Sequence, residues 1–151
     1  MIIIISIVVF LIDLISKFIV SNTLEVNESI SVIDKFFNIT YTHNYGAAWS
    51  IFEGNTYLIT IISFVIIAIL IVYIIKSKVI RKIDIIGYSL VIGGGLGNLF
   101  DRIVYGYVID FLDFNIFGYN YPIFNIADTM IVVGIFILIL FTERKVKHDN
   151  N

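Results

Sequence analysis

Long apolar runs separated by shorter polar segments dominate the pattern along this chain. Apolar side chains fill residues 2–20, 57–75, 84–103 and 123–141 almost without interruption. A helix rises about 1.5 Å per residue, so each run is long enough to cross a bilayer. The first run lacks a basic start and contains Asp13, so we expect a retained helix rather than a secretory signal. The pattern therefore predicts four transmembrane helices.

The polar segments between these runs differ from one another. Residues 37–42 alternate apolar and polar side chains, as do residues 30–32, which is typical of half-buried strands. The aromatic-rich segment 104–121, followed by Pro122, is expected to be a loop. The predicted fold class is an all-α membrane protein with four transmembrane helices and a small extracytoplasmic β-sheet and loop subdomain. A single domain is expected over residues 1–151.

Composition supports a lipid environment and excludes several functions. Hydrophobic residues make up 59% of the chain, charged residues 15%, and the mean hydropathy is +0.98. The net charge of -2 and the lack of a basic patch argue against nucleic-acid binding. Without cysteine the chain has no disulfide or thiol chemistry. The two histidines, His43 and His148, lie far apart in the sequence, so we expect no metal site.

The distribution of cations predicts the orientation of the chain in the membrane. Most of the ten Lys and Arg residues fall between the second and third runs or after the fourth. The positive-inside rule makes that side cytoplasmic. Both termini are then cytoplasmic, and the segments 22–55 and 104–121 face outward. These cations are Lys76, Lys78, Arg81, Lys82, Arg144, Lys145 and Lys147.

Two aspartates are the leading candidates for catalysis. Asp110 follows the third run, and Asp128 lies six residues after Pro122, which puts both near the outer boundary. Two carboxylates brought together in a low dielectric cannot both ionise easily, so one keeps its proton while the other acts as a base. This is the arrangement by which aspartic peptidases activate water. Taken alone, Asp110 is better explained as a solvated loop or helix-cap residue, whereas the place of Asp128 inside an apolar run favours a function.

Other polar residues in apolar surroundings are candidates for supporting roles. Asn98, Asp101 and Arg102 share one helix face at i, i+3 and i+4. Asp101 and Arg102 could form a structural ion pair or position a substrate.

Other short motifs predict how particular residues lie on the helices. Asn125 and Asp128 are three residues apart and should share a helix face, while Asp13 and Lys17 at i and i+4 could pair. A serine–lysine dyad from Ser16 and Lys17 is not expected, because neighbouring helical residues point about 100° apart. Residues 93–97 are rich in glycine and should form a helix-packing surface.

Taken together, these segments resemble the lipoprotein signal peptidase (signal peptidase II) family. The resemblance extends from Asp13 to about Gly134, with small departures at Leu14, Tyr45 and Trp49. The matching segments, in the family's order, are Asp13-x-x-Ser16-Lys17, Asn44-x-Gly46-Ala47-Ala48-x-Ser50, Gly93-Gly94-x-x-Gly97-Asn98-x-x-Asp101-Arg102, Val108-x-Asp110-Phe111 and Phe124-Asn125-x-Ala127-Asp128.

The resemblance implies a bacterial cell-membrane aspartic endopeptidase with no metal or organic cofactor. Its substrate would be a prolipoprotein, cleaved just before a cysteine that carries diacylglycerol, and its partners this substrate and membrane lipid. A monomer, and inhibition by the cyclic peptide globomycin, are expected. The resemblance gives the catalytic roles to Asp110 and Asp128. It gives supporting or substrate-binding roles to Asp13, Lys17, Asn44, Gly46, Asn98, Asp101, Arg102 and Asn125.

The sequence leaves the division of labour between the two aspartates open. In one assignment Asp128, as the more buried residue, holds the proton while Asp110 activates water. The main alternative function is a small transporter or ion-conducting protein that uses intramembrane aspartates. An inert assembly subunit is a further alternative. A presenilin-type protease would need Gly-x-Gly-Asp, whereas Gly97 is followed by Asn98.

Overall fold

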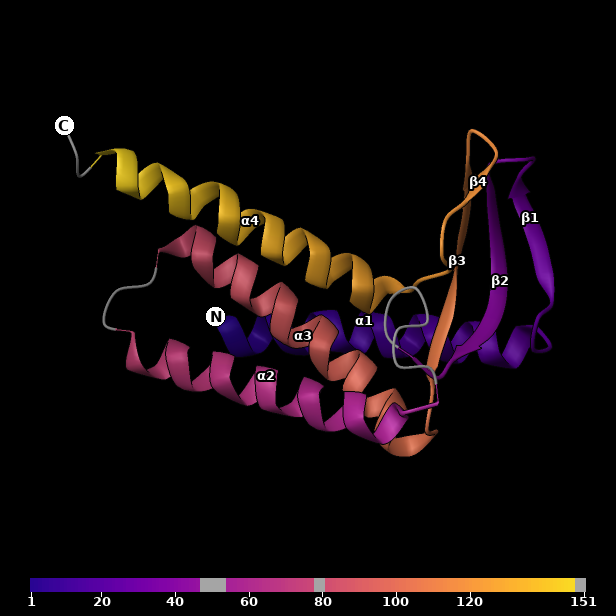
Figure 1. Cartoon of the computed structure of the whole chain (residues 1–151), viewed down its shortest axis with the longest axis horizontal. Helices are drawn as coiled ribbons and strands as arrows, with labels where there is room; N and C mark the ends of the chain where they lie inside the picture. Colours follow the sequence, from indigo (N-terminus) through magenta and orange to yellow (C-terminus); the bar gives the residue numbers. More distant parts are fainter. Residues whose placement is uncertain (47–53, 78–80, 149–151) are drawn as a thin grey trace.

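Helices and a small sheet occupy opposite ends of the molecule. The computed structural model describes residues 1–46, 54–77 and 81–148. Four helices lie side by side, with the sheet at one end and the start of α1, the end of α2, the start of α3 and the end of α4 towards the other (Figure 1). The helices are α1 (Ile2–Thr23), α2 (Thr56–Lys76), α3 (Lys82–Val104) and α4 (Ile126–His148).

The helices agree with the four predicted runs to within a few residues at most ends. Within the described residues α1, α2 and α3 are long and apolar enough to span a membrane. The apolar part of α4, Ile126–Phe141, is shorter. The protein is therefore a helical membrane protein with three or four apolar helices.

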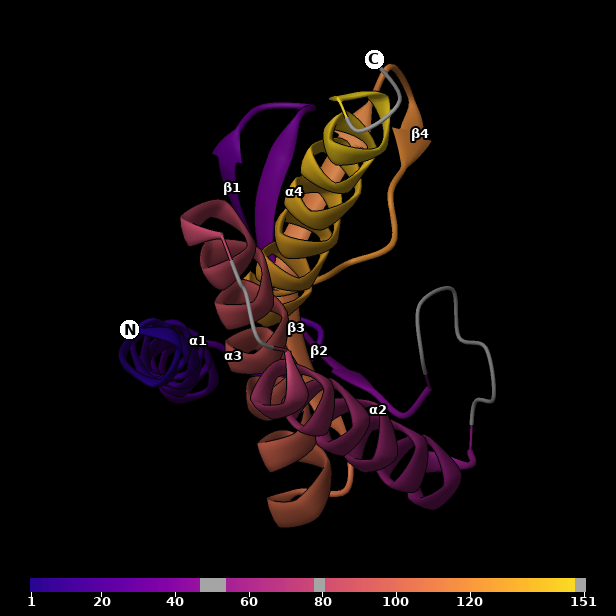
Figure 2. The same ribbon diagram turned by 90° about the vertical axis from the view of Figure 1, so that its left-hand side faces the viewer.

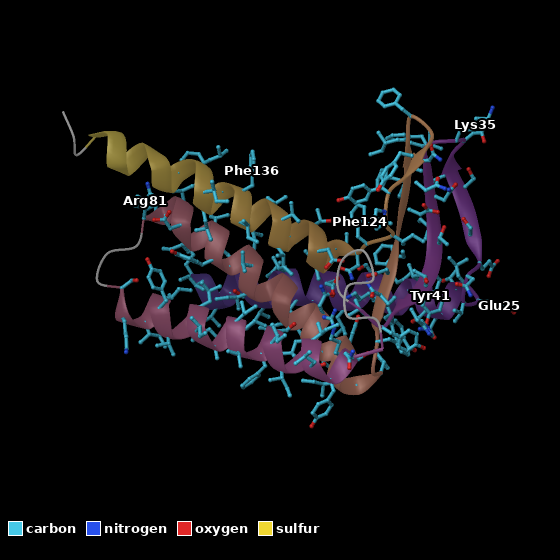
Figure 3. All side chains as sticks on the ribbon, viewed as in Figure 1. Glu25, Lys35, Tyr41, Arg81, Phe124 and Phe136 are labelled. Carbon is cyan, nitrogen blue, oxygen red and sulfur yellow. The ribbon has the colours of Figure 1, made fainter. Side chains whose placement is uncertain are left out.

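The interior of the helix bundle holds polar and charged side chains among apolar ones and glycines, whereas its exterior is apolar. The buried residues of α1 recur every three or four positions and are Ser6, Val9, Asp13, Lys17 and Val20. Large apolar side chains face outward, as Phe136 does on α4 (Figure 3). Water would penalise such an exterior, whereas hydrocarbon does not, so this arrangement fits a bilayer.

Helix α3 contacts all three other helices and lies between them in the view along the bundle (Figure 2). The predicted packing surface explains this position. A Cβ on Gly93 would lie 2.7 Å from the Ser6 carbonyl of α1. On Gly94 it would collide with the Ala127 carbonyl of α4. Small residues thus let the backbones approach closely, as membrane helix packing requires.

The sheet has four antiparallel strands in the order β1-β2-β3-β4. They are β1 (Ser29–Ile33), β2 (Phe37–Asn44), β3 (Val108–Ile116) and β4 (Tyr119–Asn120). The strands predicted at 30–32 and 37–42 correspond to β1 and β2. One face of the sheet packs on the end of α1 through a buried cluster of Val20, Leu24, Tyr41, Ile109 and Phe111.

The prediction of a loop over 104–121 was wrong, because this segment supplies β3 and β4. Strand β3 is covered on both faces: Ile109 and Phe111 pack against α1, while Asp110 and Phe114 line a cavity on the other face. Val108–Phe111 are buried on both faces and show no simple alternation, which hid the start of the strand, although residues 112–116 do alternate.

The start of the fourth helix was also predicted too early. Residues 122–125 are not helical, and Phe124 bridges to Leu112 of β3. The backbone amide of Leu112 donates to the Phe124 carbonyl at 2.7 Å. Helix α4 therefore begins only at Ile126, once this pairing with the sheet ends.

Replacing Gly94 with Ala should lower the stability of the bundle by about 1–3 kcal/mol, because the new methyl group meets a backbone carbonyl that cannot rotate away. Gly95→Ala is the matched control, since its Cβ would meet only the Ile67 side chain, at 3.1 Å. Thermal unfolding in detergent measures both. Equal midpoints for the two variants would contradict the close α3–α4 contact.

Candidate active site

Asp110 reaches the site from the middle of β3. Its residue is only 1% exposed. Strand pairing sets Thr42 opposite Asp110, so Asn44 lies two positions further on the same face of β2. Asn44 Nδ2 donates to Asp110 Oδ2 at 2.8 Å, and Asn125 Nδ2 donates to Oδ1 at 2.7 Å. Both oxygens of this buried carboxyl group therefore accept a hydrogen bond.

Asp128 lies in the first turn of α4, where Asn125 caps the helix. Asp128 N donates to Asn125 Oδ1 at 2.9 Å, and Asn125 N donates to Asp128 Oδ2 at 3.3 Å. This reciprocal pair is a capping box. The expectation that Asn125 and Asp128 share a helix face is therefore corrected, because Asn125 precedes the helix and bonds Asp128 directly.

The two aspartates line one cavity of about 940 Å³ between the sheet and α4. Aromatic rings form much of its wall on the sheet side. Here Phe114 stacks on Phe37 and on Phe124, with ring centroids 4.5 Å and 5.7 Å apart. Ile131 and Val132 of α4 lie opposite. The cavity thus joins two carboxyl groups to an apolar surface.

Two asparagines link the carboxyl groups. Asn125 Nδ2, which bonds Asp110, also lies 3.1 Å from Asn98 Oδ1. Asn98 Nδ2 donates to Asp128 Oδ1 at 2.7 Å. Asn125 also caps Asp128, so it is the one side chain that bonds both carboxyl groups, and Asn98 connects Asn125 to Asp128 by a second route.

Lys17 is the buried centre from which this network is organised. Its ammonium group contacts Asp13 Oδ2 at 2.7 Å, Asp101 Oδ2 at 2.8 Å and Asn98 Oδ1 at 3.1 Å. These three acceptors match its three N–H donors. Because an ammonium group only donates, the Asn98 oxygen must face Lys17, which turns the Asn98 amide nitrogen towards Asp128.

The two carboxylates paired with Lys17 also hold the backbone next to each candidate catalytic residue. Asp13 Oδ1 accepts from the amide of Ala127, one residue before Asp128, at 2.8 Å. Asp101 Oδ2 accepts from the amide of Ile109, one residue before Asp110, at 3.1 Å. The ion triad of Lys17, Asp13 and Asp101 therefore holds the backbone at the start of α4 and at the start of β3.

Arg102 faces the cavity beside Asn44 and Gly46. Its Nη2 donates to the Gly46 carbonyl at 3.0 Å and its Nη1 to the Asn98 carbonyl at 3.4 Å. Asn44 Oδ1 accepts from the Gly46 amide at 2.9 Å. Asp101, for which an ion pair with Arg102 was one expectation, instead pairs with Lys17.

Burial, and after it the neighbouring Asp128, raise the pKa of Asp110 to about 7, against the lowering effect of the hydrogen bonds from Asn44 and Asn125. An acid with such a pKa is half protonated at neutral pH, which suits proton transfer. Asp128 is less buried than Asp110 by residue exposure, which reverses the ranking expected from the sequence. Among the described residues, no group of three acidic or histidine side chains could hold a metal ion.

Comparisons with known proteins assign the chain to a family. The family model described as Signal peptidase (SPase) II matches residues 5–143. The chain belongs to the signal peptidase II family. The lipoprotein signal peptidase of Staphylococcus haemolyticus (strain JCSC1435) is 40% identical over 137 residues, covering 91% of this chain and 87% of the relative. The corresponding protein of Staphylococcus aureus (strain JH9) is 40% identical over 138 residues, covering 91% and 85%.

Two solved structures share the fold of this signal peptidase II. One, described as a bacterial membrane enzyme at 2.3 Å resolution, has a TM-score of 0.90 and 37% identity and covers 97% of this chain and 90% of its own. The other, at 1.9 Å, has a TM-score of 0.84 and 38% identity and covers 93% and 91%. Family membership makes the protein a bacterial membrane peptidase and argues against the transporter, assembly-subunit and presenilin-type alternatives.

The signal peptidase II fold brings together all the candidate residues of the sequence. Ala47, Ala48, Trp49 and Ser50 of the matched motif lie outside the described residues. Ser16 Oγ donates to the Asp13 carbonyl at 2.8 Å while Lys17 serves the ion triad, which agrees with the rejection of a serine–lysine dyad. The residues that converge are Asp13, Lys17, Asn44, Gly46, Asn98, Asp101, Arg102, Asp110, Asn125 and Asp128.

Sequence reasoning missed the aromatic wall of the cavity. Phe114 and Ile116 of this wall lie four and six residues after Asp110, and that even spacing could have placed them on its face of a strand. Phe36 gave no comparable signal, because it comes from the turn before β2 and joins the wall only through the sheet.

Replacing Lys17 with Met should destabilise the protein by about 3–5 kcal/mol, since two buried carboxylates lose their shared counter-charge. Lys76→Met removes an exposed cation from the last turn of α2 and should change stability by less than about 0.5 kcal/mol. Unfolding in detergent compares the two. A Lys17 variant as stable as the Lys76 variant would contradict the organising role of the triad.

Proposed function

We propose that this signal peptidase II removes the signal peptide from diacylglyceryl-modified prolipoproteins, by cleavage just before the lipidated cysteine, with Asp110 and Asp128 as the catalytic pair. The observation that carries this proposal is that two aspartates from separate elements line one cavity and share Asn125 as a hydrogen-bond partner. The relatives named above, lipoprotein signal peptidases, supply the substrate class.

The proposed chemistry is acid–base hydrolysis without a covalent intermediate. One carboxylate takes a proton from water, whose oxygen attacks the scissile carbonyl carbon, while the other carboxyl group donates a proton to the carbonyl oxygen. The resulting tetrahedral species collapses as the amide nitrogen is protonated and leaves. A single proton shared by the pair suffices for the first step.

We assign the resting proton to Asp110. Its residue is almost fully buried, and its pKa is raised to about 7 by burial and then by Asp128. Asp128 is more open to the cavity and lies within electrostatic reach of the Arg102 guanidinium, which favours the ionised form. In this assignment Asp128 activates water and Asp110 polarises the carbonyl.

The remaining site residues have supporting or substrate-binding roles in this proposal. Lys17, Asp13 and Asp101 fix the two backbone segments, and Asn98 and Asn125 orient the carboxyl groups. Residues at the end of β2, just after it and at the end of α3 would bind the substrate. These are Asn44, Gly46 and Arg102.

The proposed topology has four spanning helices, cytoplasmic termini and the active site at the outer face. We propose that the chain forms one domain and acts as a monomer. Arg81 lies at the end of the bundle opposite the sheet, as the positive-inside rule expects of a cytoplasmic cation (Figure 3). A signal helix lying in the bilayer would then present its outer end at the depth of the cavity.

Asp110→Asn and Asp128→Asn should each lower the rate of cleavage by about two to four orders of magnitude, because each removes a proton-transfer group. Purified variants would be mixed with a lipidated prolipoprotein, and the product followed by gel shift. Asp113→Asn is the control, since Asp113 lies on the same strand but bonds Thr40, at 2.7 Å. Undiminished cleavage by either dyad variant would refute the assignment.

The basic limb of the pH profile of kcat/KM should report Asp110, because an acid must be protonated to act and its pKa is about 7. Asn44→Ala removes a hydrogen bond that favours the ionised carboxylate, so the pKa rises and this limb moves to higher pH. Thr42→Val, which keeps the Asn44 amide, should leave the limb in place. Movement of the acid limb instead would assign Asp110 as the base.

A further inference from the structure

The turn between β3 and β4 exposes an apolar tip. Phe117 is fully exposed, and its neighbours Ile116 and Tyr119 are 43% and 59% exposed. The chain has no charged residue between Asp113 and Asp128. A soluble protein rarely presents a whole aromatic ring in this way without a partner.

The backbone of this turn holds the ring outward. Phe117 has a φ of 52° and Gly118 a φ of 84°, both in the left-handed region. Such a turn favours Asn, Asp or Gly at its first position, and a bulky residue there is uncommon. Asn115 secures the turn, because its Oδ1 accepts from the Gly118 amide at 2.9 Å. Phe117 therefore occupies a position that local chemistry would give to a smaller polar residue.

The other hairpin of the same sheet, β1–β2, has charged residues in its turn. Its turn carries Asp34, Lys35 and Phe36, of which Phe36 lines the cavity against Phe114, while Lys35 takes the left-handed position with a φ of 57°. Lys35 lies at the far edge of the sheet, away from the helices (Figure 3). Strands β3 and β4 lie on the side nearer the helices, and β1 lies on the far side (Figure 1). The apolar turn is thus the one nearer the plane where the helices end.

The underside of the apolar hairpin continues into the lipid-facing surface of α4. Ile116 and Tyr121 line the same cavity as Val132 and Val133, two exposed apolar residues of α4. Viewed along the bundle, β4 lies beside α4 rather than over the other helices (Figure 2). The hairpin therefore overhangs the region that lipid occupies around α4.

From this continuity and from the contrast between the two turns, we infer that the β3–β4 hairpin inserts its tip, Ile116–Tyr119, into the interfacial region of the outer leaflet. The partner is lipid: an uncharged aromatic and aliphatic tip suits the boundary between headgroups and acyl chains. Asp110 lies on the same strand, so on the proposed function the anchored tip would hold the catalytic carboxyl group at a fixed depth.

A spin label tests the depth of the tip directly. The chain has no cysteine, so Phe117→Cys and Lys35→Cys each give one unique labelling site, at matched left-handed positions in the two turns. The labelled proteins would be reconstituted into vesicles of phosphatidylethanolamine and phosphatidylglycerol. Collision rates with oxygen, which concentrates in lipid, and with a water-soluble nickel chelate would then be measured.

The label at 117 should show an oxygen-to-nickel accessibility ratio several-fold higher than the label at 35. Equal ratios would put the tip in water and overturn the inference. Low accessibility to both reagents at 117 would indicate contact with protein, including a second copy, and would also overturn it. Tyr119→Cys gives a second reading if the 117 variant misfolds. The readout is depth rather than cleavage, so it remains informative if the proposed dyad is wrong.

Discussion

A single buried ammonium group, that of Lys17, holds the site together. It forms ion pairs with Asp13 on its own helix and Asp101 on α3, and a hydrogen bond to Asn98 on α3. A charge in this environment is costly unless its partners are close and complete, and here every donor has an acceptor. The cost of burying Lys17 is therefore offset only when α1 and α3 are in register, which makes the triad a determinant of packing as well as of charge.

The same triad determines where the carboxyl groups of the dyad lie. Each carboxylate that pairs with Lys17 uses an oxygen to hold a backbone amide beside Asp110 or Asp128. Asn98, oriented by Lys17, directs its amide nitrogen at Asp128. Lys17 on α1 thus positions residues on β3 and α4 through its partners. This needs no direct contact between Lys17 and Asp110 or Asp128.

The polar interior depends on an apolar exterior. Large aliphatic residues cover the outward faces of the helices, and the buried positions hold Ser, Asn, Asp and Lys. In hydrocarbon the low dielectric strengthens each internal hydrogen bond and ion pair, and an unmatched polar group is correspondingly expensive. The glycines of α3 allow this interior to close, because Gly97 leaves room where a Cβ would collide with Asp13 Oδ2.

The sequence by itself determined the apolar helices, the first two strands, the pairing of Asp13 with Lys17 and the candidate residues, because these depend on periodicity, helical spacing and the high cost of polar groups in lipid. The tertiary structure alone decided that residues 108–116 form a strand, that α4 starts at Ile126 and that Asp101 pairs with Lys17 rather than Arg102. Each of these depends on partners distant in sequence: β3 is covered on both faces, and Phe124 is held by the sheet. From the sequence, the neighbouring Arg102 was one candidate partner for Asp101, and only the approach of α1 showed that Lys17 pairs with it.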